Sequence, residues 1–127
     1  MYKLKGRMID QITEPVCEIN SFKTKHWYLN GILHREDGPA IEWYDETKEW
    51  CQNGLLHRED GPAIERYNGD KEWFLNGKRH REDGPAIERY NGYKEWWLYG
   101  YFIKYGDQPK DWNELVNFYQ VEQVMND

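Results

Sequence analysis

Three histidines at a regular spacing of 23 residues are the side chains in this protein best suited by type to do chemistry. His34, His57 and His80 each begin the heptapeptide HREDGPA, so an arginine, a glutamate and an aspartate follow every imidazole. Imidazole and carboxylate groups are common zinc ligands, and a histidine oriented by a carboxylate often acts as a general base. The motif therefore raises two chemical hypotheses, a metal site and a catalytic pair.

The spacing of the three motifs argues against a metal site. If each repeat adds one β-hairpin to a sheet, successive histidines lie two strand spacings apart, about 9–10 Å. Zinc ligands lie only about 2.0–2.3 Å from the metal. Within one repeat, His, Glu and Asp would have to converge from one short loop, and the motif offers no fourth ligand. We therefore predict no metal and no other cofactor.

Catalysis is not predicted either. A general base acts on a nucleophile inside an enclosed pocket, but the only serine, Ser21, lies outside the HREDGPA repeats. Cys51 occurs in one unit, at a position that is aromatic in the others. We interpret it as a small buried hydrophobic residue, with a disulfide to Cys17 as the less favoured alternative. Three identical motifs indicate a structural requirement met three times, so we predict no enzyme activity.

The motif can instead organise a loop. We expect its aspartate to accept backbone N–H bonds in an Asx-turn before Gly-Pro, and Arg35, Arg58 and Arg81 to pair with a glutamate of a neighbouring repeat. Proline lacks an N–H and glycine permits a bend, so each motif should end a strand. The residues interpreted as structural are Trp27, Trp50, Trp73, Trp96, His34, His57, His80, Asp37, Asp60, Asp83, Gly38, Gly61 and Gly84.

The segment before each motif is predicted to form a β-hairpin. Asn76-Gly77 is a strong signal for a two-residue turn, because both residue types tolerate a positive φ. This turn sets Trp73 opposite His80, with the imidazole expected to lie against the indole. In the degenerate last unit the same register sets Trp96 opposite Ile103.

A second turn at Asn68-Gly69 completes the repeat. A two-residue loop at this position would place Glu65 opposite Glu72, which is an unfavourable like-charge pair. We therefore favour a three-residue loop over 68–70 with a bulge, which sets Arg66 opposite Glu72. The chain then folds back once in every repeat.

These elements predict a mainly β fold, an elongated single-layer antiparallel sheet of 23-residue β-hairpin repeats followed by a C-terminal α-helix. Residues 1–26 form a degenerate N-terminal repeat or cap, residues 27–100 the repeat array, and residues 101–127 a degenerate last hairpin and a capping helix.

The capping helix is predicted from Asp111 to Met125. Its apolar face would carry Trp112, Leu115, Val116 and Tyr119. Asp111 and Glu114 would form a capping box at its start. We interpret the helix as a lid over the last hairpin, with a dimerisation helix as the alternative.

The composition bounds the possible partners. The chain has 23 acidic and 17 basic residues and a formal net charge of −6. No cluster of Lys and Arg suggests binding to a nucleic-acid backbone, whereas an acidic surface could face a basic partner. No apolar run approaches the length of about 20 residues that a membrane span needs, and the first residues lack the apolar stretch of a secretory signal. We therefore expect a cytoplasmic protein.

The repeat resembles a known class. Its period, the leading Trp73, the Asn76 to His80 segment and the Tyr-Asn-Gly turn are similar to MORN repeats, and the HREDGPA version is similar to a MORN-like class found in proteins of bacteriophages and large DNA viruses. The resemblance covers roughly residues 2 to 103. It implies a β-hairpin array used for scaffolding or partner binding, and it implies no chemistry.

We predict a non-enzymatic protein that binds a partner protein, encoded by a phage or virus and inhibiting a host bacterial protein in the host cytoplasm. Binding of a nucleotide or glycan, mimicry of nucleic acid by the acidic surface, and a homodimer through a sheet edge or the helix are the alternatives. Strand alternation places one aromatic row on the face opposite the leading tryptophans. The candidate interaction surface comprises Tyr28, Phe74, Trp97, Arg35, Arg58, Arg81, Arg66 and Arg89.

Overall fold

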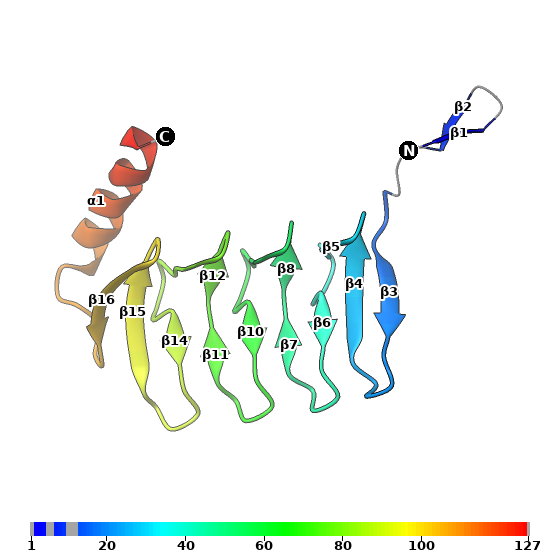
Figure 1. The fold of residues 1–127 in the computed structure, drawn as a ribbon. Helices are drawn as coiled ribbons and strands as arrows, with labels where there is room; N and C mark the ends of the chain where they lie inside the picture. Colours follow the sequence, from blue (N-terminus) through cyan, green and yellow to red (C-terminus); the bar gives the residue numbers. More distant parts are fainter. Residues whose placement is uncertain (1, 5–6, 10–12, 127) are drawn as a thin grey trace.

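The computed structural model describes residues 2–4, 7–9 and 13–126, and it shows an open antiparallel sheet with one helix at its C-terminal end (Figure 1). The expected mainly β, single-layer fold is confirmed. The sheet contains, in spatial order, β16 (Tyr101–Tyr105), β15 (Lys94–Leu98), β14 (Ile87–Glu88), β11 (Lys71–Glu72), β10 (Ile64–Glu65), β7 (Lys48–Glu49), β6 (Ile41–Glu42), β4 (Lys25–Leu29) and β3 (Val16–Ile19), with β5 (Ile32–Leu33) paired to β4.

Short hairpins continue the strands of the sheet. The strands β8 (Cys51–Gln52) and β9 (Leu55–Leu56) form one, and β12 (Phe74–Leu75) and β13 (Lys78–Arg79) form the next. In Figure 1, β8 continues the line of β7, and β12 continues the line of β11, so two short strands follow one another along the same direction. A separate hairpin joins β1 (Tyr2–Leu4) and β2 (Arg7–Ile9).

The two-residue turns at Asn-Gly are confirmed. Phe74 lies opposite Arg79, and Asn76 and Gly77 take φ values of 48° and 81°, as a type I′ turn requires. The last unit differs from the expectation, because Trp96 lies opposite Lys104 and not opposite Ile103. A register shift beside Trp96 leaves Ile103 without a partner in the ladder, and Ile103 packs against the apolar cluster next to the helix.

The second turn has the expected three-residue length but lies one residue earlier, over 67–69. The Arg66 N–H donates to the Asp70 carbonyl at 2.9 Å, and Glu65 lies opposite Lys71. The predicted register with Arg66 opposite Glu72 is therefore wrong. The observed register pairs opposite charges at Glu65 and Lys71 and places Gly69, with a φ of 98°, at the end of the loop, where a positive φ is needed.

The buried core is thin and follows the repeat. Each unit contributes one alanine and one isoleucine to it, namely Ala40, Ile41, Ala63, Ile64, Ala86 and Ile87. At the C-terminal end the core widens into a cluster of Trp96, Leu98 and Trp112. A sheet with one layer can bury only small residues along its length, so the larger rings gather where the helix supplies a second layer.

The helix α1 (Trp112–Met125) covers the last unit, as expected. Trp112 is buried with its ring 5.0 Å from that of Trp96, and Leu115, Val116 and Tyr119 pack on the same cluster. The predicted capping box is wrong, because Asp111 has a φ of −101° and a ψ of 39° and makes no side-chain cap hydrogen bond. Among the residues described, no helix has the length and apolar character needed to cross a membrane.

Candidate functional site

The histidine of each HREDGPA motif joins its repeat to the next one. The Nδ1 atom of His57 accepts a hydrogen bond of 2.9 Å from the backbone N–H of Asn76, in the hairpin turn 19 residues later. His34 and His80 accept equivalent bonds from Asn53 at 3.0 Å and Tyr99 at 2.9 Å. All three imidazoles are buried. A nitrogen that accepts a hydrogen bond carries no proton, so this joint requires the acceptor form of Nδ1.

The expectation that the imidazole is the group stacked on the leading tryptophan is wrong. The register is as predicted, since the His57 N–H donates to the Trp50 carbonyl at 2.9 Å. The group over the Trp50 ring is the guanidinium of Arg58, whose Cζ lies 3.8 Å from the ring centroid. Arg35 and Arg81 lie over Trp27 and Trp73 in the same way, at 3.9 and 3.8 Å.

The glycine of the motif makes room for this guanidinium. A Cβ atom at residue 61 would lie 2.9 Å from the Arg58 Cζ, and the equivalent distances at residues 38 and 84 are 2.8 and 2.6 Å. Heavy atoms that are not bonded do not approach so closely without repulsion. Each arginine thus lies over an indole ring and against the glycine, where a side chain would displace its guanidinium.

The remaining bonds of the arginine close the loop on itself. Arg58 donates from Nε to Asp60 at 3.1 Å and from Nη1 to the Pro62 carbonyl at 3.0 Å and to Glu65 at 2.8 Å. The predicted pairing with a glutamate of a neighbouring repeat is therefore wrong, because Glu65 follows in the same repeat. The Asp60 carboxylate accepts from the Arg58 guanidinium, which replaces the expected Asx-turn.

In the third motif the glutamate also anchors the helix. The Glu82 carboxylate accepts from the Tyr99 hydroxyl at 3.0 Å and from Gln120 of α1 at 3.1 Å, and it lies 3.1 Å from His80 Nε2. Burial acts to raise the pKa of Glu82, but the hydrogen bonds from Gln120, Tyr99 and His80 outweigh it and hold the pKa below its usual value. Burial and the Glu82 carboxylate raise the pKa of Tyr99 to about 12.

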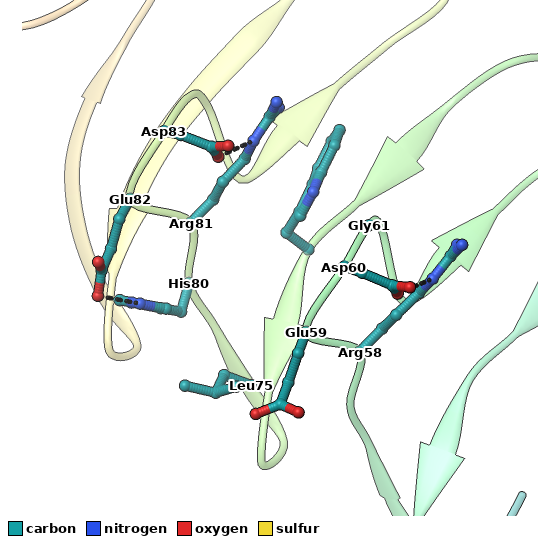
Figure 2. A pocket seen from close by; sticks show the side chains of 10 residues that line it. Arg58, Glu59, Asp60, Gly61, Leu75, His80, Arg81, Glu82 and Asp83 are labelled. Atoms are coloured by element: carbon teal, nitrogen blue, oxygen red, sulfur yellow. Dashed lines mark hydrogen bonds and ion pairs between the residues drawn. The ribbon is translucent and has the colours of Figure 1, made fainter. Parts of the chain in front are cut away.

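Open hollows lie between successive HREDGPA loops. One has a volume of about 690 Å³ and is bounded by the loops of the second and third motifs, with Trp73 and Leu75 in its lining. Figure 2 shows the Asp60 and Asp83 carboxylates directed to the arginines of their own loops, and the Glu82 carboxylate meeting His80. A second hollow of about 600 Å³ has Trp50 and Gln52 in its lining, and a third of about 300 Å³ has Trp27 in its lining.

The candidate interaction residues fall into three groups. Arg35, Arg58 and Arg81 belong to the loops described above. Tyr28, Phe74 and Trp97 are half-buried, and the rings of Phe74 and Trp97 lie 5.4 and 5.3 Å from the guanidinium of Arg79. A direct role of these residues in partner binding stays a prediction.

The remaining two candidates surround a buried carboxylate. Glu72 is only 3% exposed. Arg66 and Arg79 each lie 3.2 Å from its carboxylate oxygens, and Arg89 lies 3.4 Å from it and also 3.4 Å from Asp70. A buried carboxylate needs such partners, because burying an unpaired charge is costly.

A more exposed aromatic row lies at the second turns, and the sequence reasoning missed it. Tyr44, Tyr67 and Tyr90 are 73%, 72% and 72% exposed. They recur at the same 23-residue spacing as the motif, which was the signal that could have identified them. We call the six residues Trp43, Tyr44, Arg66, Tyr67, Arg89 and Tyr90 the turn rim.

The backbone of the turn rim is anchored by the preceding repeat. The Tyr67 N–H donates to Thr47 Oγ1 at 3.1 Å, and the Tyr90 N–H donates to Asp70 Oδ1 at 2.8 Å. The bond from Tyr90 holds the pKa of Asp70 below its ordinary value of 3.8, with a further contribution from Arg89. These two bonds hold the backbone from which the phenol rings of Tyr67 and Tyr90 project.

No protein-family model, curated protein or solved structure matches this chain.

Across the described part of the chain, no group of three His, Cys, Asp or Glu side chains is arranged to hold a metal ion. Cys17 is exposed and Cys51 is buried, and both are free thiols. Burial and the nearby Glu49 carboxylate raise the pKa of Cys51 to about 11, which keeps it protonated and unreactive at neutral pH. The exposed side chains that recur at the 23-residue spacing include carboxylates, phenols and the lysines Lys48, Lys71 and Lys94.

Proposed function

We propose that this protein is a non-enzymatic repeat protein that binds a partner protein through the turn rim. The observation that carries the proposal is the row formed by Tyr44, Tyr67 and Tyr90, three rings exposed by more than 70% at equivalent positions of successive repeats. Large exposed rings in a regular row on a soluble protein are characteristic of interaction surfaces.

The residue types of the rim suit a protein interface. Tyr, Trp and Arg are the residues most enriched among those that dominate binding energy, and the rim contains no other type. Because Thr47 and Asp70 fix the backbone of Tyr67 and Tyr90, little backbone freedom remains to be lost on binding. A tyrosine side chain also loses little conformational entropy, having two χ angles.

The partner that we propose is a bacterial host protein whose activity is inhibited by the contact. This finer proposal is supported by the similarity of the HREDGPA repeats to MORN-like repeats of bacteriophages and large DNA viruses. In this proposal the row of exposed tyrosines contacts a host protein and not a small molecule.

The test compares two variants of the full chain as bait in a bacterial lysate. Tyr67→Ser with Tyr90→Ser removes two rings of the rim, and Tyr101→Ser with Tyr105→Ser removes two exposed rings from β16. We expect the wild type and the β16 variant to retain the same protein, and the rim variant to lose it while its circular dichroism spectrum is unchanged. A partner retained equally by the folded rim variant would contradict the proposal, as would the absence of any specifically retained protein.

A further inference from the structure

The hollows between the HREDGPA loops form a second surface, distinct from the turn rim. Equivalent residues line the two larger hollows, because Trp50 and Trp73, and likewise His57 and His80, occupy matching positions. Each of these hollows combines an indole with carboxylates from two successive loops. The third hollow, at Trp27, combines an indole with the carboxylates of the first loop and of Glu14.

Carboxylates outnumber guanidinium groups in the lining of the two larger hollows. One is lined by the carboxylates of Glu59, Asp60, Glu82 and Asp83 and by the guanidinium groups of Arg58 and Arg81. The other is lined by the carboxylates of Glu36, Asp37, Glu59 and Asp60 and by the guanidinium group of Arg58. A row of one sign of charge along a surface attracts a ligand of the opposite sign.

The carboxylates at the mouths of the hollows are open to solvent. The side chains of Asp37, Asp60 and Asp83 are each 88% exposed, and that of Glu36 is 79% exposed. Groups of the same types already hold a guanidinium in this protein, because the Arg58 guanidinium lies over the Trp50 ring and pairs with the Asp60 carboxylate. An arginine or lysine of a partner can lay its aliphatic stem on the apolar lining and keep its charge at the exposed carboxylates.

The spacing of the hollows selects the form of the ligand. Successive hollows are two strand spacings apart, about 9–10 Å. A polyproline II segment rises about 3.1 Å per residue with three residues per turn, so every third side chain lies on the same side at intervals of about 9.3 Å. A β-strand repeats its same-side positions at about 6.6–6.8 Å and does not match.

We propose that the row of hollows binds an extended basic segment of a partner protein, in polyproline II conformation, with Arg or Lys at every third residue. Three consecutive basic side chains occupy the hollows at Trp27, Trp50 and Trp73. A preformed polyproline II segment loses little conformational entropy on docking. The carboxylates at the edge of the hollows attract the basic side chains electrostatically, so the affinity of the complex falls as the salt concentration rises.

The first test uses two synthetic peptides of equal composition and charge, one with Pro-Pro-Arg repeated three times and one with its three arginines contiguous. Binding to the full-length protein is measured by fluorescence anisotropy at low salt. We expect the spaced peptide to bind about fivefold more tightly or better, because in the contiguous peptide the arginines cannot reach separate hollows. Equal affinities, or no binding of the spaced peptide, would overturn the proposal.

The second test locates the binding site. Glu36→Gln with Glu59→Gln neutralises two exposed carboxylates of the row, and Glu114→Gln with Glu122→Gln neutralises two exposed carboxylates of α1. Both variants lose the same charge, so a weakening of about fivefold or more in the first variant alone supports the site. Equal effects of the two variants would contradict it.

The turn rim variant Tyr67→Ser with Tyr90→Ser separates this proposal from the proposed function. Spaced-peptide binding should be unchanged in that variant. A loss of peptide binding there would move the peptide to the rim and overturn the assignment to the hollows. Failure of the peptide to bind the wild type would leave the partner contact at the rim intact.

Discussion

The guanidinium of Arg58 occupies the space that a side chain at residue 61 would need, with its Cζ 2.9 Å from the position of a Cβ atom there. The same guanidinium lies over the Trp50 ring, with its Cζ 3.8 Å from the ring centroid, so a side chain at residue 61 would displace the guanidinium from this position. Packing against an arginine therefore explains why a glycine stands at this position. Its backbone conformation does not explain it, because Gly61 has no positive φ and other residues adopt such a conformation.

Replacing Gly61 with Ala should destabilise the protein by about 1–3 kcal/mol, the usual cost of overpacking, as measured by urea unfolding. The matched control is the double variant Gly61→Ala with Arg58→Ala. If the guanidinium is the cause, the alanine at residue 61 should cost much less in the Arg58→Ala background. Strictly additive effects would indicate a backbone cause.

Replacing His57 with Leu removes the acceptor of the Asn76 N–H and should cost about 0.5–1.5 kcal/mol of folding stability. The specific measurement is hydrogen exchange of the Asn76 amide, which should lose protection while the equivalent amide of Asn53, held by His34, keeps it. His57→Asn, which retains an acceptor of similar reach, should restore part of the protection. An unchanged exchange rate of the Asn76 amide in His57→Leu would refute the role of the hydrogen bond between Asn76 and His57.

Stability should fall as the pH drops below about 6.5, because burial lowers the pKa of His80 below its ordinary value of 6.5 despite the opposing effect of Glu82. The unfolded chain then binds the proton first, so the loss begins near the unfolded pKa and continues to the lower folded one. His80→Asn should remove this part of the pH dependence. Thermal unfolding of both proteins between pH 7.5 and 5 provides the comparison, and identical slopes would contradict the assignment.

Only one of the two thiols should react in the native protein. Cys17 is exposed, and Cys51 is buried with a pKa raised to about 11, so a thiol reagent at pH 7 should label one residue per chain. In denaturant it should label both. Mass spectrometry of the labelled peptides identifies the residue, and rapid native labelling of Cys51 would show that its site opens readily.

Replacing Trp112 with Phe should loosen α1. The Trp112 Nε1 donates to the Glu82 carbonyl at 2.6 Å, and Phe keeps most of the ring contact with Trp96 while losing this bond. We expect a cost of about 0.5–1.5 kcal/mol and faster amide exchange within 112–125. The exchange of Leu75, far from the helix in the sequence, serves as the internal reference and should not change.

The repetition in the sequence was enough to predict the fold, because a strict period and an Asn-Gly turn leave few arrangements open. The register at Asn76-Gly77 follows from turn chemistry alone. The turn at Asn68-Gly69 was placed one residue late, since the prediction paired Arg66 with Glu72 directly across the ladder. Arg66 reaches Glu72 diagonally in the observed register, at 3.2 Å.

The side-chain roles within the motif were harder to predict. Nothing in the sequence indicates that His57 Nδ1 meets an amide 19 residues away, because that contact depends on how two hairpins stack. The role of Gly61 was also ambiguous, since a glycine before proline fits both a bend and a close approach. The turn rim is hard to predict because Tyr44, Tyr67 and Tyr90 lie in turns. Strand alternation, which assigns side chains to one face of a sheet or the other, does not apply there.

The arginine of each HREDGPA motif bonds to a glutamate of its own unit, and each imidazole Nδ1 accepts a hydrogen bond from the following unit. Adding or removing one complete unit within the array would therefore keep the same hydrogen bonds between successive units and would leave the two terminal units unchanged. The protein behaves as a ruler whose reach grows by about 9–10 Å per inserted unit. Duplication or loss of a single unit in the gene could thus match the length of this molecule to that of a new target without any redesign.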